Sequence, residues 1–452
     1  MARDVVERLT AADLGGGVAV PGSADFDRRR RIWNAVVDRH PAAIARPTTA
    51  DGVAAVVRAA AEFDALLSVR CGGHSFSGHS TCDGGVVLDL SAMNSVSIDR
   101  ATGRCVVGGG ALLGDVDRAA APHGLAVPAG VVSHTGIGGL TLGGGMGWLS
   151  RLHGLTIDSL VGVDIVTADG ALRHASAESE PALFWALRGG GGNFGVVVAF
   201  EFQARAVGPV WVGNWVYPLA DIHDAMLGAA ELAGDAPREL TISFSATRLG
   251  VALTAFWVGT PARADATLAP FGRLTASAAG RHGPVSFLDL QTRNDQHSAW
   301  GRRYYAKGGF VRRVDAALVD CIADALAEGP TDHSEVYVPQ LGGAVEDVDE
   351  DATAYSGRGA GFYWLVEPIW DGPADDARCL EWGRRHGRRL AALSMDTNYV
   401  NEQADTGGGF PEQAYGSSKY RRLRDIKARC DRTNLFRLNA NIEPAGAAAA
   451  SS

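Results

Sequence analysis

The chain carries two different hydrophobic patterns, one in its first half and the other in its second half. In the first half, residues 48–63 carry Ala and Val at helical spacing behind a Thr cap, which predicts a helix. The apolar run at 65–70 predicts a short buried strand. In the second half, residues 210–219, 239–249 and 251–259 alternate apolar and polar positions. That alternation predicts an antiparallel sheet with one open face, so the fold class is α+β.

The same criteria place the remaining elements. Further strands are expected at 85–90, 95–99, 104–109, 194–207, 334–343 and 361–370, with two more around an Asp-Gly turn within 159–176. Further helices are expected at 111–122, 179–190, 262–280, 315–328 and 419–431. Most Trp and Tyr residues beyond 210 lie on or near the predicted sheet, where they form either ordinary core or a bed for a planar substrate.

Composition and charge narrow the possible partners. The chain has 452 residues, 46% hydrophobic and 21% charged, with a formal net charge of −9. This acidic balance argues against nucleic-acid binding. No run of eighteen apolar residues predicts a membrane span, and the charged N-terminal stretch lacks a hydrophobic signal core. Six irregularly spaced Cys without a CxxC indicate reduced thiols, so a cytoplasmic protein is expected; no oligomeric state is assigned.

Glycine is concentrated in four clusters, at 71–74, 106–114, 136–147 and 187–195. Each cluster alone is explained by a turn, where glycine adopts positive φ. Four clusters in one half of the chain instead indicate a large ligand lying along exposed backbone.

The stretch "VRCGGHSFSGHS" at 69–80 leaves the predicted strand at 65–70. His74 and His79 have no supporting carboxylate or Cys set, so no metal site is predicted. A Walker loop would need Lys, the glycines at 136–145 fit a dinucleotide fingerprint poorly, and no convincing GxSxG is present. What remains is a loop of backbone N–H groups able to hold a pyrophosphate, with a His beside it.

Five motifs in order resemble one family. They are "VRCGGH", "VGGGALLGDV", "VVSHTGIGGLTLGGGMGWLSRLHGLTIDSL", "PALFWALRGGGGNFGVV" and the tail "NYVN…YGSSKYRRLRDIKARCDRTNLFRLNANIEP". Together they are similar to the FAD-linked oxidases of the vanillyl-alcohol-oxidase superfamily, in the berberine-bridge-enzyme-like branch, and in size to its compact bacterial members. The resemblance spans about residues 40–444, although 210–395 matches only in pattern.

The resemblance implies an FAD-binding domain at 1–206, a substrate domain with an antiparallel sheet backed by helices at 207–395, and a C-terminal segment at 396–452 that returns to the FAD domain. It also implies that His74 bonds covalently to the flavin 8α-methyl group. The residues expected around FAD are Arg70, Cys71, Gly72, Gly73, His74, Ser75, Gly78, His79, Gly130, Val132, Ser133, His134, Thr135, Gly138, Gly139, Gly143, Gly144, Gly147, Trp148, Gly195, Val196, Val198, Tyr399, Asn401 and Asn441.

Three positions refine that expectation. Many relatives carry a Cys that forms a second flavin link, but Val132 stands at that position, so a single link through His74 is expected. Thr135 falls near the position that controls oxygen access. Where relatives place a Tyr base after "NYxN", this chain has Glu402, which is either the catalytic base or a solvated loop acid. Tyr399, Tyr304 and Tyr355 are the other catalytic candidates.

The expected function is therefore an FAD-dependent oxidase. It would move a hydride from an alcohol or amine carbon of a bulky organic substrate to flavin N5 and then reduce O₂ to H₂O₂. The alternatives are a flavin dehydrogenase with another electron acceptor and a flavin-dependent cyclase.

Overall fold

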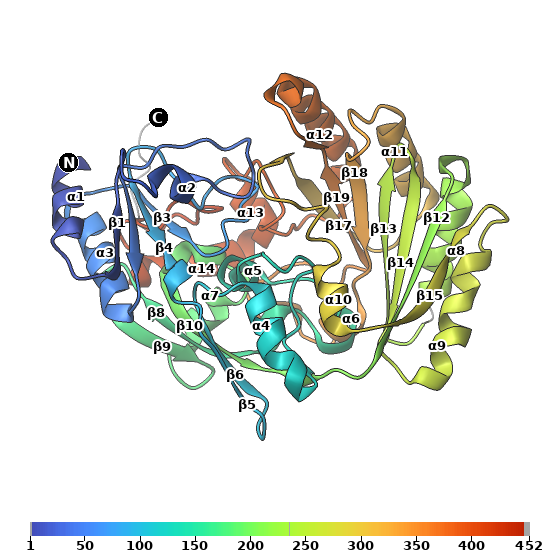
Figure 1. Cartoon of the computed structure of the whole chain (residues 1–452), viewed down its shortest axis with the longest axis horizontal. Helices are drawn as coiled ribbons and strands as arrows, with labels where there is room; N and C mark the ends of the chain where they lie inside the picture. The colour runs from blue at the N-terminus through green and yellow to red at the C-terminus, as the bar shows by residue number, and fades with distance from the viewer. Residues whose placement is uncertain (1, 235, 447–452) are drawn as a thin grey trace.

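The computed structural model describes residues 2–234 and 236–446, which form two lobes side by side (Figure 1). The N-terminal lobe, blue to green in the figure, carries two sheets, and the other lobe, green to orange, carries one large sheet. The last segment, in red, returns to the first lobe. Within the described residues, no helix has the length and apolar character needed to cross a membrane.

The first lobe is built on a mixed sheet and an antiparallel sheet. The mixed sheet has the order β1 (Gly15–Ala19), β2 (Ala43–Pro47), β4 (Val86–Asp89), β3 (Leu67–Arg70), with β2, β3 and β4 parallel. The antiparallel sheet has the order β5 (Val96–Asp99), β6 (Arg104–Gly108), β10 (Val196–Gln203), β8 (Leu160–Val166), β9 (Leu172–Ser176). A small ribbon pairs β7 (Leu125–Ala126) with β11 (Arg205–Ala206).

Helices of the first lobe fill the connections between these strands. They are α1 (Ala2–Thr10), α2 (Phe26–Arg30), α3 (Ala50–Glu62), α4 (Leu113–Ala120), α5 (Ile137–Gly143), α6 (Ser150–His153) and α7 (Pro181–Leu187). The Thr49 side chain caps α3, as its sequence predicts. Helix α5 was not predicted, because it begins after Gly136 inside the third glycine cluster and glycine disfavours helices.

The second lobe contains the antiparallel sheet that the alternating pattern predicts. Its antiparallel sheet has the order β15 (Ala279–Val285), β12 (Val210–Tyr217), β14 (Gly250–Trp257), β13 (Leu240–Thr247), β18 (Glu335–Pro339), β19 (Phe362–Glu367), β17 (Lys307–Val311). Helices α8 (Ile222–Gly234), α9 (Pro261–Leu268), α11 (Ala316–Ala327) and α12 (Asp376–Ala391) pack on one face. A short pair joins β16 (Arg303–Tyr304) to β20 (Ile369–Trp370), and α10 (Phe287–Thr292) lies toward the first lobe.

One expectation for this lobe was wrong. The predicted helix at 262–280 ends early, since α9 and a 3₁₀ turn at Ala269–Arg273 give way to the edge strand β15, which pairs with β12. Of the two alternatives for the aromatic residues, ordinary core holds for Phe244, Trp257 and Trp364, which point into the core beneath the helices, because apolar area is stabilised there by removal from water. Tyr337, on the open face, lines the cavity instead.

The C-terminal segment is tied to the first lobe by a buried ion pair. Helices α13 (Phe410–Tyr415) and α14 (Ser417–Cys430) lead to it. Lys427 Nζ lies 2.8 Å from the Asp431 carboxylate, and both side chains are fully buried. Lys427 also donates to the carbonyls of Asn193 and Phe436. A buried charge pair of this kind is tolerated only when the remaining hydrogen-bonding capacity of both groups is satisfied. These contacts therefore fix the position of the C-terminal segment on the first lobe.

Candidate active site

A cavity of about 490 Å³ lies between the two lobes and the C-terminal segment. It falls in the size range of small-molecule and cofactor sites. Most of the residues predicted to surround FAD line it: Cys71, Gly72, Gly73, His74, Ser75, His79, Gly130, Val132, Thr135, Gly138, Gly139, Trp148, Gly195, Val196, Tyr399 and Asn401. Glu402, the candidate base, lines it as well.

The loop after β3 presents bare backbone to this cavity. The N–H groups of residues 73–77 donate to no other described residue, whereas the next amides, of Gly78 and His79, bond back to Ser75. Consecutive unpaired N–H groups form a concavity that favours an anion. Arg70, at the end of β3, turns away and donates to the carbonyl of Arg29. The loop can therefore hold a pyrophosphate through main-chain donors.

Two glycine-rich loops meet without room for side chains. A Cβ on Gly136 would lie 2.3 Å from the Gly72 nitrogen and 2.5 Å from Cys71 Sγ, and a Cβ on Gly72 would meet the backbone of Gly136. A Cβ on Gly139, in contrast, would meet nothing within 4 Å. The first pair fixes the floor of the cavity, and Gly139 leaves that floor open to a flat ligand.

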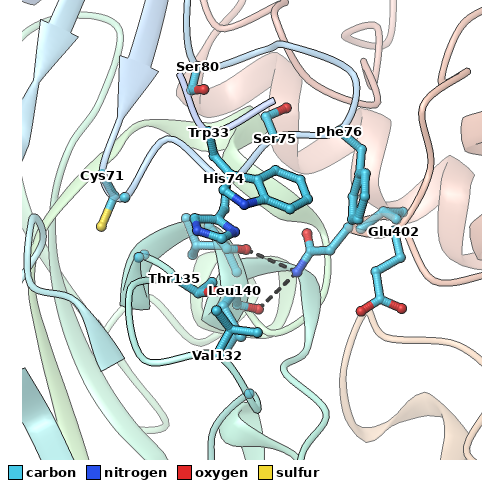
Figure 2. A pocket seen from close by; sticks show the side chains of 18 of the residues that line it. Trp33, Cys71, His74, Ser75, Phe76, Ser80, Val132, Thr135, Leu140 and Glu402 are labelled. Carbon is cyan, nitrogen blue, oxygen red and sulfur yellow. Dashed lines mark hydrogen bonds between the residues drawn. The ribbon is translucent and has the colours of Figure 1, made fainter. Parts of the chain in front are cut away.

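His74 is held between aromatic rings at the cavity wall. Its ring stacks on Trp33 with centroids 4.6 Å apart, and Trp33 stacks in turn on Tyr304. His74 Nε2 lies 2.6 Å from Nδ1 of His134. Burial, aided by His134, lowers the pKa of His74 well below its ordinary value, so the imidazole is neutral. Figure 2 shows His74 beneath the Trp33 indole, with Val132 and Thr135 on its other side.

The "NYVN" segment closes one end of the site. Asn401 Nδ2 donates to the carbonyls of Gly139 and Leu140 at 3.2 and 3.1 Å, the bonds dashed in Figure 2. The Tyr399 hydroxyl accepts from the Gly145 amide and from Asn401. These bonds fix residues 399–402 against the third glycine cluster, at 136–147.

Glu402 is the acid of this segment that reaches the cavity. Burial raises the pKa of its carboxyl to about 7. A group that titrates near neutral pH can accept a proton and release it again. Glu402 and His74 line the same cavity (Figure 2).

The open face of the large sheet supplies two glutamates, Glu335 and Glu367, and the segment after α10 brings His297 beside them; these three residues form an acidic wall. Glu335 and Glu367 stand directly opposite each other on β18 and β19, and both line the cavity. Glu335 accepts a 3.0 Å bond from His297 Nε2, and this contact raises the pKa of His297 to about 9. Glu367 is only 8% exposed, and its carboxylate makes no hydrogen bond to a described residue. Burial and the facing Glu335 raise its pKa.

Other predicted site residues lie behind the wall rather than on it. They are Arg70, Gly78, Ser133, His134, Gly143, Gly144, Gly147, Val198, Asn441, Tyr304 and Tyr355. The Tyr304 hydroxyl donates to the Ala299 carbonyl, and the Tyr355 hydroxyl lies 3.9 Å from Met146 Sδ. Burial raises the pKa of both tyrosines, which makes a tyrosinate base costly at either position.

Sequence reasoning missed Trp33 and the acidic wall. Trp33 lies in an irregular N-terminal segment, and no motif points to it. Glu335 and Glu367 did carry a signal. Each is a charged residue in an otherwise apolar strand, at a position whose adjacent neighbours, Val336 and Val366, face the core. Glutamate buried in such a place needs a partner or a function.

Three buried polar atoms test whether FAD fits this cavity. Ser80 Oγ, Trp148 Nε1 and the Tyr415 hydroxyl belong to residues that line it, yet they have no hydrogen-bond partner among the described residues. Buried polar atoms are normally paired. With the free amides of residues 73–77, they form a set of donors along a narrow space between glycine loops. The residues present therefore fit a long ligand with phosphate and polar ring atoms.

Comparison with known families gives the same result. The FAD binding domain family matches residues 41–176, and the berberine and berberine-like family matches residues 398–443. An FAD-linked oxidoreductase of Dictyostelium discoideum is 31% identical over 436 residues, 95% of each chain.

Solved structures share the fold. The 6-hydroxy-D-nicotine oxidase of Arthrobacter nicotinovorans superposes with a TM-score of 0.85 at 27% identity, covering 94% of this chain and 97% of that one. Glucooligosaccharide oxidase of Acremonium strictum, which carries a 6-S-cysteinyl, 8α-N1-histidyl FAD, has a TM-score of 0.88 at 24% identity and covers 97% of this chain and 99% of its own. At that identity the likeness concerns the fold alone. The family matches and the full-length relative show that this chain is an FAD-linked oxidoreductase of the berberine-bridge-enzyme-like branch of the vanillyl-alcohol-oxidase superfamily.

Proposed function

We propose that this protein is an FAD-dependent oxidase whose flavin is linked covalently through His74 alone. The observation that carries the proposal is the position of His74. Its neutral ring lines the cavity beside the free amides of residues 73–77, and Val132, which cannot form a thioether, lies on its other side.

The residues around the cavity divide the work of the reaction. Bound FAD would supply a hydride acceptor, and a flavin oxidase passes the electrons on to O₂. The free amides of the first loop hold the phosphates, and the glycine floor admits the flat ring. Asn401 and Tyr399 fix the segment that carries Glu402. Glu402 takes the proton from the substrate N–H or O–H while the neighbouring C–H loses its hydride.

The acidic wall favours an amine as the substrate. His297 bonds to Glu335, and its charge also acts to lower the pKa of Glu367, but no hydrogen bond from His297 or another described residue reaches the Glu367 carboxylate. The Arg293 guanidinium also lines the cavity, and it donates to Asn214. An ammonium group beside Glu367 would complete this set, and its binding would release the proton that the raised pKa retains.

A sugar alcohol is the second candidate substrate. Ser243, Ser245 and Thr254 bring hydroxyl groups to the same face of the sheet, and hydroxyls on a sheet suit the hydrogen bonds of a carbohydrate. The two solved relatives represent both classes, an amine in the nicotine oxidase and an oligosaccharide in the other enzyme.

Acid precipitation tests the covalent link directly. The flavin is expected to stay with the precipitated wild-type protein, and mass spectrometry should find its mass on the peptide that contains His74. His74→Ala should release all of its flavin to the supernatant. Flavin released from the wild type would contradict the link. Oxygen consumption with H₂O₂ formation on amine or sugar substrates separates an oxidase from a dehydrogenase, and turnover without oxygen uptake would contradict the acceptor.

A further inference from the structure

The function proposed above gives no role to the bond between His74 and His134. Their nitrogens approach to 2.6 Å, with ring centroids 4.7 Å apart and planes tilted by 41°. His134 lies behind the cavity wall, so its side chain acts on the site through His74. A histidine paired with a second histidine has the arrangement of a nucleophile and its base.

The surroundings of His134 fix which nitrogen carries the proton. His134 Nε2 lies 3.4 Å from the backbone carbonyl of Asp295, which can only accept. With its proton on Nε2, His134 presents a bare Nδ1 to His74. The Nε2–H of His74 then donates to that nitrogen, and Nδ1 of His74 is left with its lone pair free.

The Asp295 carbonyl is itself held in place. The Asp295 carboxylate accepts from the amide of Ser133 at 2.8 Å and from its hydroxyl at 2.5 Å. Ser133 is the residue before His134, so one loop of the substrate lobe orients the histidine through two contacts. A nucleophile, a base and a group that orients the base are thus present in order.

Among the described residues, His134 is the only hydrogen-bond partner that can accept the His74 proton. Trp33 covers one face of the ring, and Trp300 stands with its edge toward it at 6.2 Å between centroids. The only hydrogen bond of the His74 side chain to a described residue is the one to His134. Burial keeps His74 neutral, which leaves it nucleophilic.

We propose that His134 is the base of flavin attachment, taking the Nε2 proton of His74 as its Nδ1 bonds to the 8α carbon of FAD. The proposal rests on the covalent link proposed above. The new N–C bond replaces one N–H bond of His74 and one C–H bond of the 8α-methyl group. Two electrons and two protons are released, and dioxygen takes them up as H₂O₂.

The rate of attachment tests this role without any substrate. Apoprotein is mixed with FAD in air, and acid-precipitable flavin is measured against time for the wild type, His134→Ala and His134→Asn. Loss of a general base costs about 10²–10⁴-fold in rate, so both variants should attach flavin at least 100-fold more slowly. Both should still bind FAD, measured by quenching of its fluorescence. Added imidazole should restore attachment in His134→Ala, because it can enter the space left and accept the proton.

His174→Ala is the matched control, since this exposed histidine on β9 also pairs with a neighbour, Asp164 at 2.9 Å, but far from the cavity wall. It should attach flavin at the wild-type rate. Attachment at that rate by both His134 variants would overturn the inference while leaving the link intact. Slow attachment that imidazole does not restore would also overturn it, because it would show a merely structural role. Absence of covalent flavin in the wild type would remove the link itself, and with it this role.

Discussion

The two walls of the cavity are made of different parts of the protein chain. The wall of the first lobe is mostly backbone, with free amides at 73–77 and glycines where Cβ atoms have no room. The wall of the second lobe is a sheet face of Ser, Thr, Tyr and Glu side chains. A backbone wall recognises what all members of a family bind, and a side-chain wall can change from one member to the next. We therefore expect changes in the first wall to affect the flavin and changes in the second to affect the substrate.

Of these predictions, Gly136→Ala should have the largest effect, because it should disrupt the wall of the first lobe and with it flavin binding. The added methyl group would lie 2.3 Å from the Gly72 nitrogen and 2.5 Å from Cys71 Sγ, so the two loops must separate. Overpacking of this kind costs about 1–3 kcal/mol of stability, and the purified variant should hold little or no flavin. The measurement is the ratio of absorbance at 450 nm to that at 280 nm.

Gly139→Ala is the control for that prediction, because its methyl group would meet no protein atom within 4 Å. Its thermal unfolding without flavin should match that of the wild type. An equal loss of stability in both variants would show that the contact between the loops is not the cause.

Glu402→Gln should keep its flavin and lose turnover. Removal of a base costs about 10²–10⁴-fold, so kcat should fall by at least 100-fold. The base must be ionised to accept a proton, and its pKa is about 7. The wild-type rate should therefore rise with pH through neutrality and level off above it, and the variant should lack this rise. A wild-type profile flat from pH 5 to 9 would contradict the assignment of Glu402.

Glu367→Gln should change selectivity with the smallest effect. The amide keeps the shape of the side chain but cannot balance an ammonium group, so KM for a cationic amine should rise by about tenfold or more. A neutral substrate of similar size should be affected much less. Steady-state kinetics on both substrates gives the comparison, and equal changes for the two would favour the sugar alternative over the amine.

The same division explains how much the sequence could predict. The first wall could be located because a free-amide loop and two touching backbones need glycine at fixed positions, as at Gly72 and Gly136. Helix α5 shows the limit of this kind of prediction. Its glycines indicate close contact between backbones, but they also have low helix propensity, so the helix could not be predicted from the sequence.

The second wall could be predicted only as a pattern. Alternation predicted a sheet with one open face, and that is correct. It could not reveal that Glu335 faces Glu367, because this pairing depends on the register of β18 against β19. The alternation also could not reveal that Trp33 stacks between His74 and Tyr304. These three residues are far apart in the sequence and meet only in the folded protein.

The position of the C-terminal segment determines when the protein can bind its cofactor, because this segment completes the wall of the cavity. Residues 399–402 and 436, 438, 439 and 440 line the cavity, and Lys427 anchors them through its contacts with Asp431, Asn193 and Phe436. On the ribosome, the first glycine loop, at 71–74, emerges more than 300 residues before these parts of the wall. Domains fold as the chain appears, N-terminal first, so the nascent first lobe waits with an incomplete pocket. Capture of the flavin must therefore wait until the C-terminal segment has been synthesised.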